Sequence, residues 1–177
     1  DNGIAFAGAK TTLYEPGMRL PLIVREPGQK KKGRTQDAMI SWVDLAPTLL
    51  DYAGVDLSDS ALHGRSFKKG VSGKLKNWDH VFASHTNHEA TMYYPMRVIK
   101  NRQYKLIFNI AHGLEFPLAK DLLQSPTWVS MQKNGLKLYG KRTPEALLHR
   151  PRIELYHLQA DPHEVVNLSE DPNYAKI

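Results

Sequence analysis

The sequence predicts an α/β protein organised in two parts. An apolar run at 20–24 indicates a strand, and apolar residues at helical spacing over 35–52 indicate a helix after it. The stretch 64–76 is rich in Gly and Lys and poor in apolar residues, which favours a boundary there. We therefore predict one part over 1–75 and a second over 76–177. The periodicity supports the elements and leaves their assembly open.

In the first part, Leu20–Val24 ends in β-branched residues and is bounded by Pro27 and Gly28, as expected for a buried strand. Thr35–Tyr52 should be helical, with Met39, Ile40, Val43, Leu49 and Leu50 on its apolar positions. Pro47 lacks a backbone N–H, so we expect it to divide this helix into two segments. Gly54 should end the second segment.

The second part contains the signals of four strands. Asp79–Ser84, Met96–Ile99, Tyr104–Ile110 and Ile153–Leu158 are the predicted strands. The short polar connection at 101–103 makes the second and third of them a hairpin. Pro126 should open a helix that continues to about Lys133, and Thr143 should be the N-cap of another helix. Asp161 and Pro162 indicate a turn.

The composition of the 177 residues restricts the class of protein. An apolar fraction of 41% argues against disorder, and the absence of Cys excludes a disulfide framework in this chain. No apolar run approaches the length needed to cross a membrane. The net charge of +6, with a dense run at Lys30–Lys32, is compatible with an acidic partner. No recognisable nucleic-acid module accompanies these charges, so we predict no nucleic-acid partner, and a solvated loop is the favoured interpretation of that run.

The first three residues, Asp1-Asn2-Gly3, allow two interpretations. A carboxylate and a carboxamide offer hard oxygen ligands to Ca²⁺ or Mg²⁺, and the Gly permits a tight turn that presents both. The same triplet is also typical of a plain surface turn. Lys10 alone is equally compatible with a solvated surface lysine. The segments that follow them along the chain favour the functional interpretation.

The chain resembles the sulfatase family over nearly its whole length, and within it the heparan N-sulfatases, or sulfamidases. The segments that carry the resemblance are Asp1–Val24, Ser41–Gly54, His88–Arg97, Phe116–Thr127 and Glu154–Leu168. The first and last are similar to opening and closing motifs shared by many sulfatases. The segments at His88–Arg97 and Phe116–Thr127 are similar to the sulfamidase subgroup.

This resemblance implies a fold and an assembly. It implies the C-terminal part of an alkaline-phosphatase-like sulfatase catalytic domain, followed by a small α+β domain with an antiparallel sheet and a packed helix. It also implies that Asp1 and Asn2 ligate Ca²⁺ and that Lys10 contacts the sulfate. The family's formylglycine nucleophile arises from Cys or Ser in a motif that this chain lacks, so we expect it on an upstream segment and expect the piece alone to be inactive.

The resemblance also suggests where a sugar would bind. His88, Glu89, Tyr94 and Arg97 belong to the one polar and aromatic cluster suited to a sulfated glucosamine, with His85 and Tyr93 beside them. An equally weighted alternative is that His88 and Glu89 pair locally at a domain interface.

The function implied is hydrolysis of the N-sulfate of glucosamine in heparan-type glycans. The alternatives are an O-sulfatase acting on another sulfated sugar or aryl sulfate, and a noncatalytic polyanion-binding module. The expected partner is a sulfated glycan, and we predict no membrane partner. The oligomeric state is open, with a homodimer as one option. Family habit implies a periplasmic or secreted enzyme in bacteria and a lysosomal one in animals.

Overall fold

The computed structural model describes residues 5–6, 8–29, 32–73 and 75–177. The chain forms two compact units. The first unit combines the residues up to Pro21 with Phe82–Ile177, and the second comprises Leu22–Val81. Packing therefore joins the beginning of the chain to its second half, whereas the predicted parts 1–75 and 76–177 are each continuous. The domain assignment itself stays a prediction.

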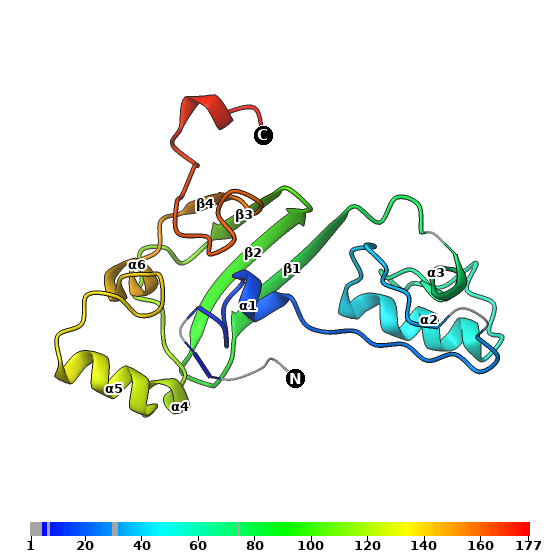
Figure 1. Cartoon of the computed structure of the whole chain (residues 1–177), viewed down its shortest axis with the longest axis horizontal. Helices are drawn as coiled ribbons and strands as arrows, with labels where there is room; N and C mark the ends of the chain where they lie inside the picture. Colours follow the sequence, from blue (N-terminus) through cyan, green and yellow to red (C-terminus); the bar gives the residue numbers. More distant parts are fainter. Residues whose placement is uncertain (1–4, 7, 30–31, 74) are drawn as a thin grey trace. The chain divides into compact units, whose positions relative to one another are not determined.

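The first unit is built on a four-stranded sheet of order β1-β2-β3-β4 (Figure 1). Its strands are β1 (His80–Asn87), β2 (Tyr93–Asn101), β3 (Tyr104–Asn109) and β4 (Ile153–His157). β3 pairs antiparallel with both β2 and β4. The Asn101 side-chain oxygen accepts the backbone N–H groups of Gln103 and Tyr104 and closes the β2–β3 turn. The four predicted strands and the hairpin are confirmed.

One face of the sheet is buried because side chains alternate along each strand. On β2 the buried residues of this face are Tyr94, Met96 and Val98, Pro95 being buried as well, and on β3 the residue opposite Val98 is Ile107. These residues form a core with Leu13, Tyr14, Phe116 and Tyr156. The N-terminal segment with α1 (Glu15–Met18) thus packs on the buried face of the sheet (Figure 1).

A second core lies among short helices, α4 (Lys120–Leu123), α5 (Pro126–Lys133) and α6 (Pro144–Leu148). Its members are Met92, Ala119, Leu122, Trp128, Met131, Tyr139 and Leu147. The two predicted helices are confirmed, since Pro126 begins α5 and the Thr143 hydroxyl accepts the Ala146 N–H at the start of α6. Pro at the first helical position fits because no N–H is required there. α1 and α4, at four residues each, were not predicted.

The segment after β4 is held to the sheet through side chains. The amide oxygen of Asn167 accepts the Leu155 N–H at 2.8 Å, and its amide nitrogen donates to the Ile153 carbonyl at 3.0 Å. Asn167 thus pairs with the backbone of β4 as a neighbouring strand would. Asp161 turns the chain by accepting the N–H groups of Val165 and Val166, which confirms the predicted turn. The 3₁₀ helix η2 (Pro172–Tyr174) follows.

The second unit contains the 3₁₀ helix η1 (Trp42–Asp44), α2 (Leu45–Tyr52) and α3 (Lys68–Ser72). The prediction that Pro47 divides a helix over 35–52 was wrong. α2 begins at Leu45, so Pro47 lies in its first turn, where its missing N–H has no carbonyl to pair with. Gly54, at φ 77°, follows the end of α2 as expected.

One other prediction was also wrong. Leu20–Val24 is not a strand, and Ile23 is 92% exposed. A strand needs a neighbour for its backbone hydrogen bonds, and within the described residues this segment has none in the sheet. The Gly- and Lys-rich stretch 64–76 contains α3, which was not predicted.

Candidate functional site

Lys10 lies in a tight turn whose geometry is fixed by its neighbours. Thr11 adopts a left-handed conformation with φ 65°, which is uncommon for a β-branched residue. The Thr12 hydroxyl bonds to the carbonyls of Gly8 and Ala9, both at 2.9 Å. At Gly17 an added Cβ would lie 2.4 Å from the Thr12 carbonyl oxygen, so only glycine lets α1 approach the turn. The turn that carries Lys10 therefore has a well-defined backbone conformation.

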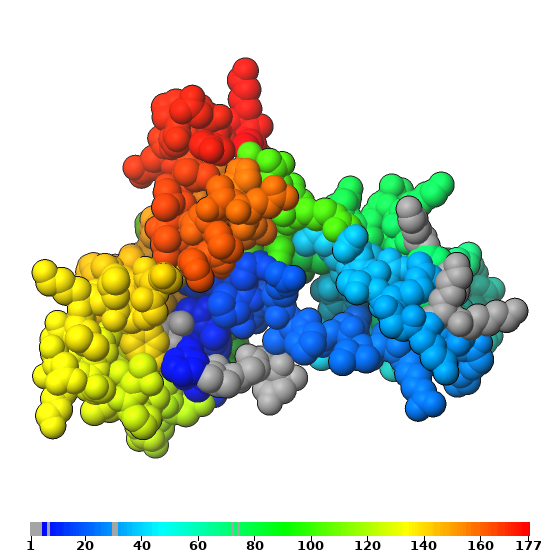
Figure 2. All heavy atoms as spheres, in the orientation of Figure 1, coloured from blue at the N-terminus to red at the C-terminus, as the bar shows by residue number. Residues whose placement is uncertain are grey.

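The Lys10 ammonium bonds to the carboxylate of Asp121 at 2.5 Å. The Lys10 side chain is 23% exposed and that of Asp121 51% exposed. Lys10 lowers the pKa of Asp121 through this hydrogen bond. In Figure 2 the first described residues, in dark blue, lie against the yellow-green segment that includes α4. Two residues 111 positions apart thus meet at the surface of the sheet unit.

The four predicted sugar-binding residues are not gathered at one point. His88 and Glu89 are exposed in the connection between β1 and β2, where the His88 N–H bonds to the Met92 carbonyl. Tyr94 and Arg97 lie three positions apart on β2 and so face opposite sides of the sheet. Tyr94 is fully buried, with its ring edge-on to Phe116, whereas Arg97 is exposed. The alternative that His88 and Glu89 pair locally stays a prediction.

His85 lies on β1 and contacts the backbone of β2. Its Nδ1 lies 3.2 Å from the Tyr94 carbonyl, so this nitrogen carries the proton and donates it. Burial lowers the pKa of His85, with smaller contributions from His88 and Arg150. Its Nε2, the Tyr94 hydroxyl and Nη2 of Arg150 are buried polar atoms without a hydrogen-bond partner. Buried groups of this kind are commonly bridged by ordered water.

A buried ionic network beneath the N-terminal segment was missed by the sequence reasoning. The Lys105 ammonium is fully buried and contacts the carboxylates of Glu15 at 2.8 Å and Glu164 at 2.7 Å. It also donates to the Leu13 carbonyl at 3.1 Å. Lys100 lies opposite Lys105 on the neighbouring strand and contacts the same Glu15 oxygen at 2.5 Å. Glu15 therefore bridges two like charges that would otherwise repel across the strands.

The two carboxyls of this network titrate in opposite directions. Burial would raise the pKa of Glu15, but Lys105 and Lys100 outweigh burial, and its pKa is lowered. Burial raises the pKa of Glu164 despite the attraction of Lys105. Glu164 also accepts the Glu15 backbone N–H at 2.6 Å. Glu164, which belongs to the closing motif Glu154–Leu168, thus holds the segment that follows the Lys10 turn. Period-two alternation was the available signal, since it places Lys105 on the face of Ile107.

A second buried carboxylate, Glu154 on β4, joins this strand to β3 and to the N-terminal segment. It accepts hydrogen bonds from the hydroxyls of Tyr14 at 2.7 Å and Tyr156 at 2.5 Å. The Asn109 amide donates to its other oxygen at 2.6 Å. Burial is the main reason that the pKa of each of these tyrosines is raised. The guanidinium of Arg142 lies 3.6 Å from the centre of the Tyr14 ring, in cation–π contact.

The predicted metal ligands Asp1 and Asn2 lie outside the described residues. Among the residues that the structure does describe, no group of three or more His, Cys, Asp or Glu side chains is arranged to hold a metal ion. Within the same residues no helix is both long enough and apolar enough to cross a membrane.

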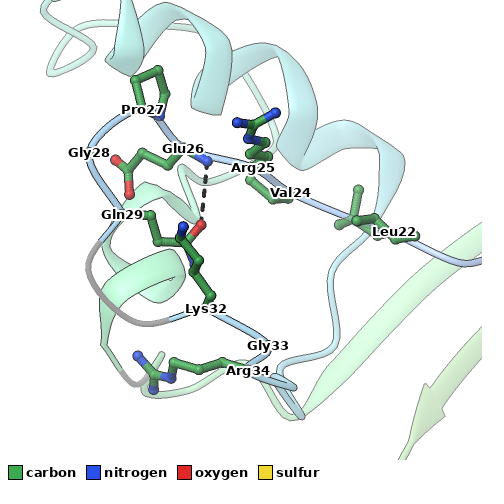
Figure 3. Close-up of a pocket in the computed structure, with 11 residues that line it drawn as sticks. Leu22, Val24, Arg25, Glu26, Pro27, Gly28, Gln29, Lys32, Gly33 and Arg34 are labelled. Atoms are coloured by element: carbon green, nitrogen blue, oxygen red, sulfur yellow. Dashed lines mark hydrogen bonds between the residues drawn. The ribbon is translucent and has the colours of Figure 1, made fainter.

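The second unit contains a hollow of about 860 Å³ within one loop (Figure 3). All of its lining residues come from this loop, and Arg25, Lys32 and Arg34 make the lining rich in positive charge. Glu26 donates its backbone N–H to the Gln29 side chain at 3.5 Å across the loop. Lys30 and Lys31, which belong to the basic run predicted as a solvated loop, lie outside the described residues.

Comparisons with known proteins give one consistent result. The sequence model of the family "N-sulphoglucosamine sulphohydrolase, C-terminal" matches residues 8–133. Human N-sulphoglucosamine sulphohydrolase is 34% identical in an alignment that covers 100% of this chain and 38% of the human protein. An ulvan-active sulfatase from Formosa agariphila is 28% identical over 100% of this chain and 33% of its own length. The chain therefore spans about a third of the length of these relatives.

A solved structure is also similar. It is the structure of a protein in complex with its substrate D-glucosamine-2-N,6-O-disulfate, with a TM-score of 0.61 and 27% identity. The alignment covers 93% of this chain and 27% of that one. The predicted resemblance and fold class are thereby confirmed.

Proposed function

Because the chain belongs to the N-sulphoglucosamine sulphohydrolase C-terminal family, we propose that it forms the C-terminal part of a sulfatase acting on N-sulfoglucosamine in heparan-type glycans. The observation that carries this proposal is the alignment with human N-sulphoglucosamine sulphohydrolase along the whole chain. The partner is then a sulfated glycan. The proposal includes a formylglycine nucleophile outside this chain and a location in the periplasm, outside the cell or in a lysosome.

Lys10 is the described residue proposed to act on the sulfonate group. A sulfamate spreads negative charge over its oxygens, and a positioned ammonium stabilises that charge as the S–N bond breaks. Lys10 is partly exposed, so its charge is reachable, and the turn fixes the backbone that carries it. We assign it electrostatic stabilisation and no proton transfer.

Asp1 and Asn2 are proposed to hold Ca²⁺, since their oxygen donors suit that ion. A bound divalent cation would add charge stabilisation at the sulfonate oxygens. Replacing Asp1 with Ala in the full-length protein should abolish calorimetrically measured Ca²⁺ binding and turnover together. Retained Ca²⁺ binding with full turnover would refute the ligand assignment.

Sugar recognition is proposed for the exposed members of the predicted set, His88, Glu89 and Arg97. Arg97 presents a guanidinium that can bind a carboxylate or sulfate through two parallel hydrogen bonds. Tyr94 is buried in the core, so we propose that it supports β2 from beneath. Its direct contact with a sugar stays a prediction.

The test is sulfate release by the full-length polypeptide, produced with a formylglycine-generating enzyme and supplied with Ca²⁺. Glucosamine N-sulfate and glucosamine 6-O-sulfate are compared as substrates. Release from the N-sulfate alone is the expected result. Release from the 6-O-sulfate alone would replace the sulfamidase proposal with an O-sulfatase.

Two alternatives have support of their own. An O-sulfatase is favoured by the resemblance to an ulvan-active sulfatase and to a protein whose substrate carries both N- and 6-O-sulfate. A polyanion-binding module is favoured by the basic loop with Arg25, Lys32 and Arg34. Sulfate release from neither substrate, together with heparin binding that is lost with added salt, would support the binding module.

A further inference from the structure

We propose that Asp121 is a positioning residue for Lys10, holding the ammonium where a sulfonate group of the substrate can meet it. This inference rests on the role proposed for Lys10. It follows from the 2.5 Å contact between the Lys10 ammonium and the Asp121 carboxylate, made between segments 111 residues apart. Both residues belong to the same compact unit.

The backbone on the lysine side of this contact is fixed. The Thr12 hydroxyl bonds twice within the turn, and the close approach of Gly17 leaves no space for rearrangement. Beyond the turn, buried Lys105 holds the Leu13 carbonyl and buried Glu164 holds the Glu15 N–H. The Lys10 backbone is therefore anchored on its C-terminal side by two buried charges.

The aspartate side is equally anchored. Asp121 belongs to α4, whose Leu122 is 1% exposed in the second core. Ala119, which precedes α4, is fully buried in the same core. The carboxylate of Asp121 thus projects from a helix with a packed opposite face. With the backbone anchored on both sides, only the Lys10 and Asp121 side chains themselves can move within the contact.

The chemistry of the ammonium makes such a partner useful. A lysine has three N–H donors on a flexible four-carbon stem. One donor bonded to Asp121 orients the ammonium, and two donors remain for the oxygens of a sulfonate. Orientation of a charged group before substrate arrives is a recognised source of rate enhancement. The competing interpretation is an ordinary surface ion pair with no effect on the reaction.

The pairing is tested first on this chain without substrate. Lysines are acetylated briefly, and peptide mass spectrometry gives the rate at each position for the wild type, D121A and the matched control D59A. Removal of Asp121 should raise the Lys10 rate about two- to fivefold. D59A, which changes an exposed carboxylate in the other unit, should leave it unchanged. An equal Lys10 rate in D121A and wild type would overturn the proposal.

The positioning role is then tested in the full-length sulfatase by a double-mutant cycle of D121A and K10Q. D121A should lower kcat/KM about 10- to 100-fold but have no further effect when K10Q is present. An undiminished effect of D121A in the K10Q background would overturn the proposal, because Asp121 would then act by another route. Full turnover by K10Q alone would refute the Lys10 role in the proposed function, and the acetylation result would still report the pairing separately.

Discussion

The two compact units of this chain differ in how far their apolar side chains are buried. The sheet unit buries them in two clusters, and residues such as Tyr94, Met96, Ile107 and Leu147 are fully inaccessible. In the unit formed by Leu22–Val81, apolar side chains of the described residues remain largely at the surface. The most exposed are Ile23 at 92%, Leu49 at 69% and Trp42 at 66%.

Polar contacts organise the second unit instead. The Asp44 carboxylate accepts the N–H groups of Ser41 and Arg65, at 2.8 and 2.9 Å. The Thr48 hydroxyl donates to the Asp44 carbonyl and accepts the Phe67 N–H. Asp44 and Thr48 are both buried, so these bonds are shielded from water. The unit has defined local geometry without a large apolar core within its described part.

This contrast indicates that different interactions stabilise the folded structures of the two units. Apolar burial at about 25 cal/mol per Å² dominates the free energy of unfolding wherever a core exists. The sheet unit has that term together with a buried ionic network around Lys105. The second unit relies on hydrogen bonds, each of which contributes only about 1 kcal/mol net. Substitutions of the same kind should therefore have unequal effects in the two units.

The largest difference should come from matched ion pairs. Replacing Lys105 with Met leaves Glu164 buried without its cation, and we expect the sheet unit to lose about 3–5 kcal/mol of unfolding free energy. The control, Lys68→Met, removes the half-exposed pair of Lys68 with Asp51 and should change stability little. Hydrogen exchange of β2–β3 and α2 peptides in rising urea would measure both. Equal losses would show that the buried network is not what distinguishes the units.

Matched apolar truncations should give the next largest effect. Ile107→Ala removes a fully buried side chain at the centre of the sheet and should cost about 3 kcal/mol through lost burial and a residual cavity. Leu49→Ala, on the exposed face of α2, should change stability by less than about 0.5 kcal/mol. Urea titrations followed by circular dichroism provide the comparison. A large loss for Leu49→Ala would mean that the α2 face is covered in solution.

The same contrast explains which parts of the fold were predictable. The hairpin at 101–103, the N-cap Thr143 and the start of α5 at Pro126 depend on residues within one turn, and all three are confirmed. The strand predicted at Leu20–Val24 depended on neighbouring strands that the described residues do not supply. An apolar run gives the tendency of a segment, whereas pairing decides whether a strand forms.

The candidate site was predictable only in part, for a related reason. Lys10 came from a motif, but its partner Asp121 lies 111 residues away, and no local pattern joins the two. Period-two alternation places Lys105 on the buried face of β3, but no local pattern joins Lys105 and Glu164 to Leu13 and Glu15, which are distant in the sequence. The opposite facing of Tyr94 and Arg97 could have been derived from period-two alternation.

A glycine in each unit allows a test that involves no charge and no core. At Gly64 an added Cβ would lie 1.9 Å from the Val43 carbonyl oxygen, so Gly64→Ala should cost the second unit about 1–3 kcal/mol by forcing the backbone apart. Gly113 has no atom within 4 Å of its added Cβ, and Gly113→Ala should be neutral or slightly stabilising. Thermal unfolding monitored by segment-resolved hydrogen exchange would separate the two. Equal behaviour would indicate that the Val43–Gly64 contact opens in solution.

The smallest expected effect is a pH dependence confined to the sheet unit. Burial lowers the pKa of His85 from its ordinary 6.5. As the pH falls below 6.5, His85 binds a proton in the unfolded chain but remains neutral in the folded one. The unfolding free energy therefore decreases, by at most about 1.4 kcal/mol per pH unit for one proton. His88 and Arg150 add to this effect because their charges also disfavour the protonated ring.

The measurement is the unfolding free energy of the sheet unit at pH 7.5 and pH 5.5. His85→Gln removes the titrating ring and should flatten this pH dependence, while His112→Gln, at an exposed position, should retain it. The second unit should show no matching change in His85→Gln, since His85 belongs to the other unit. If His85→Gln kept the full wild-type slope, another group would be responsible, and the buried, neutral state assigned to His85 would be wrong.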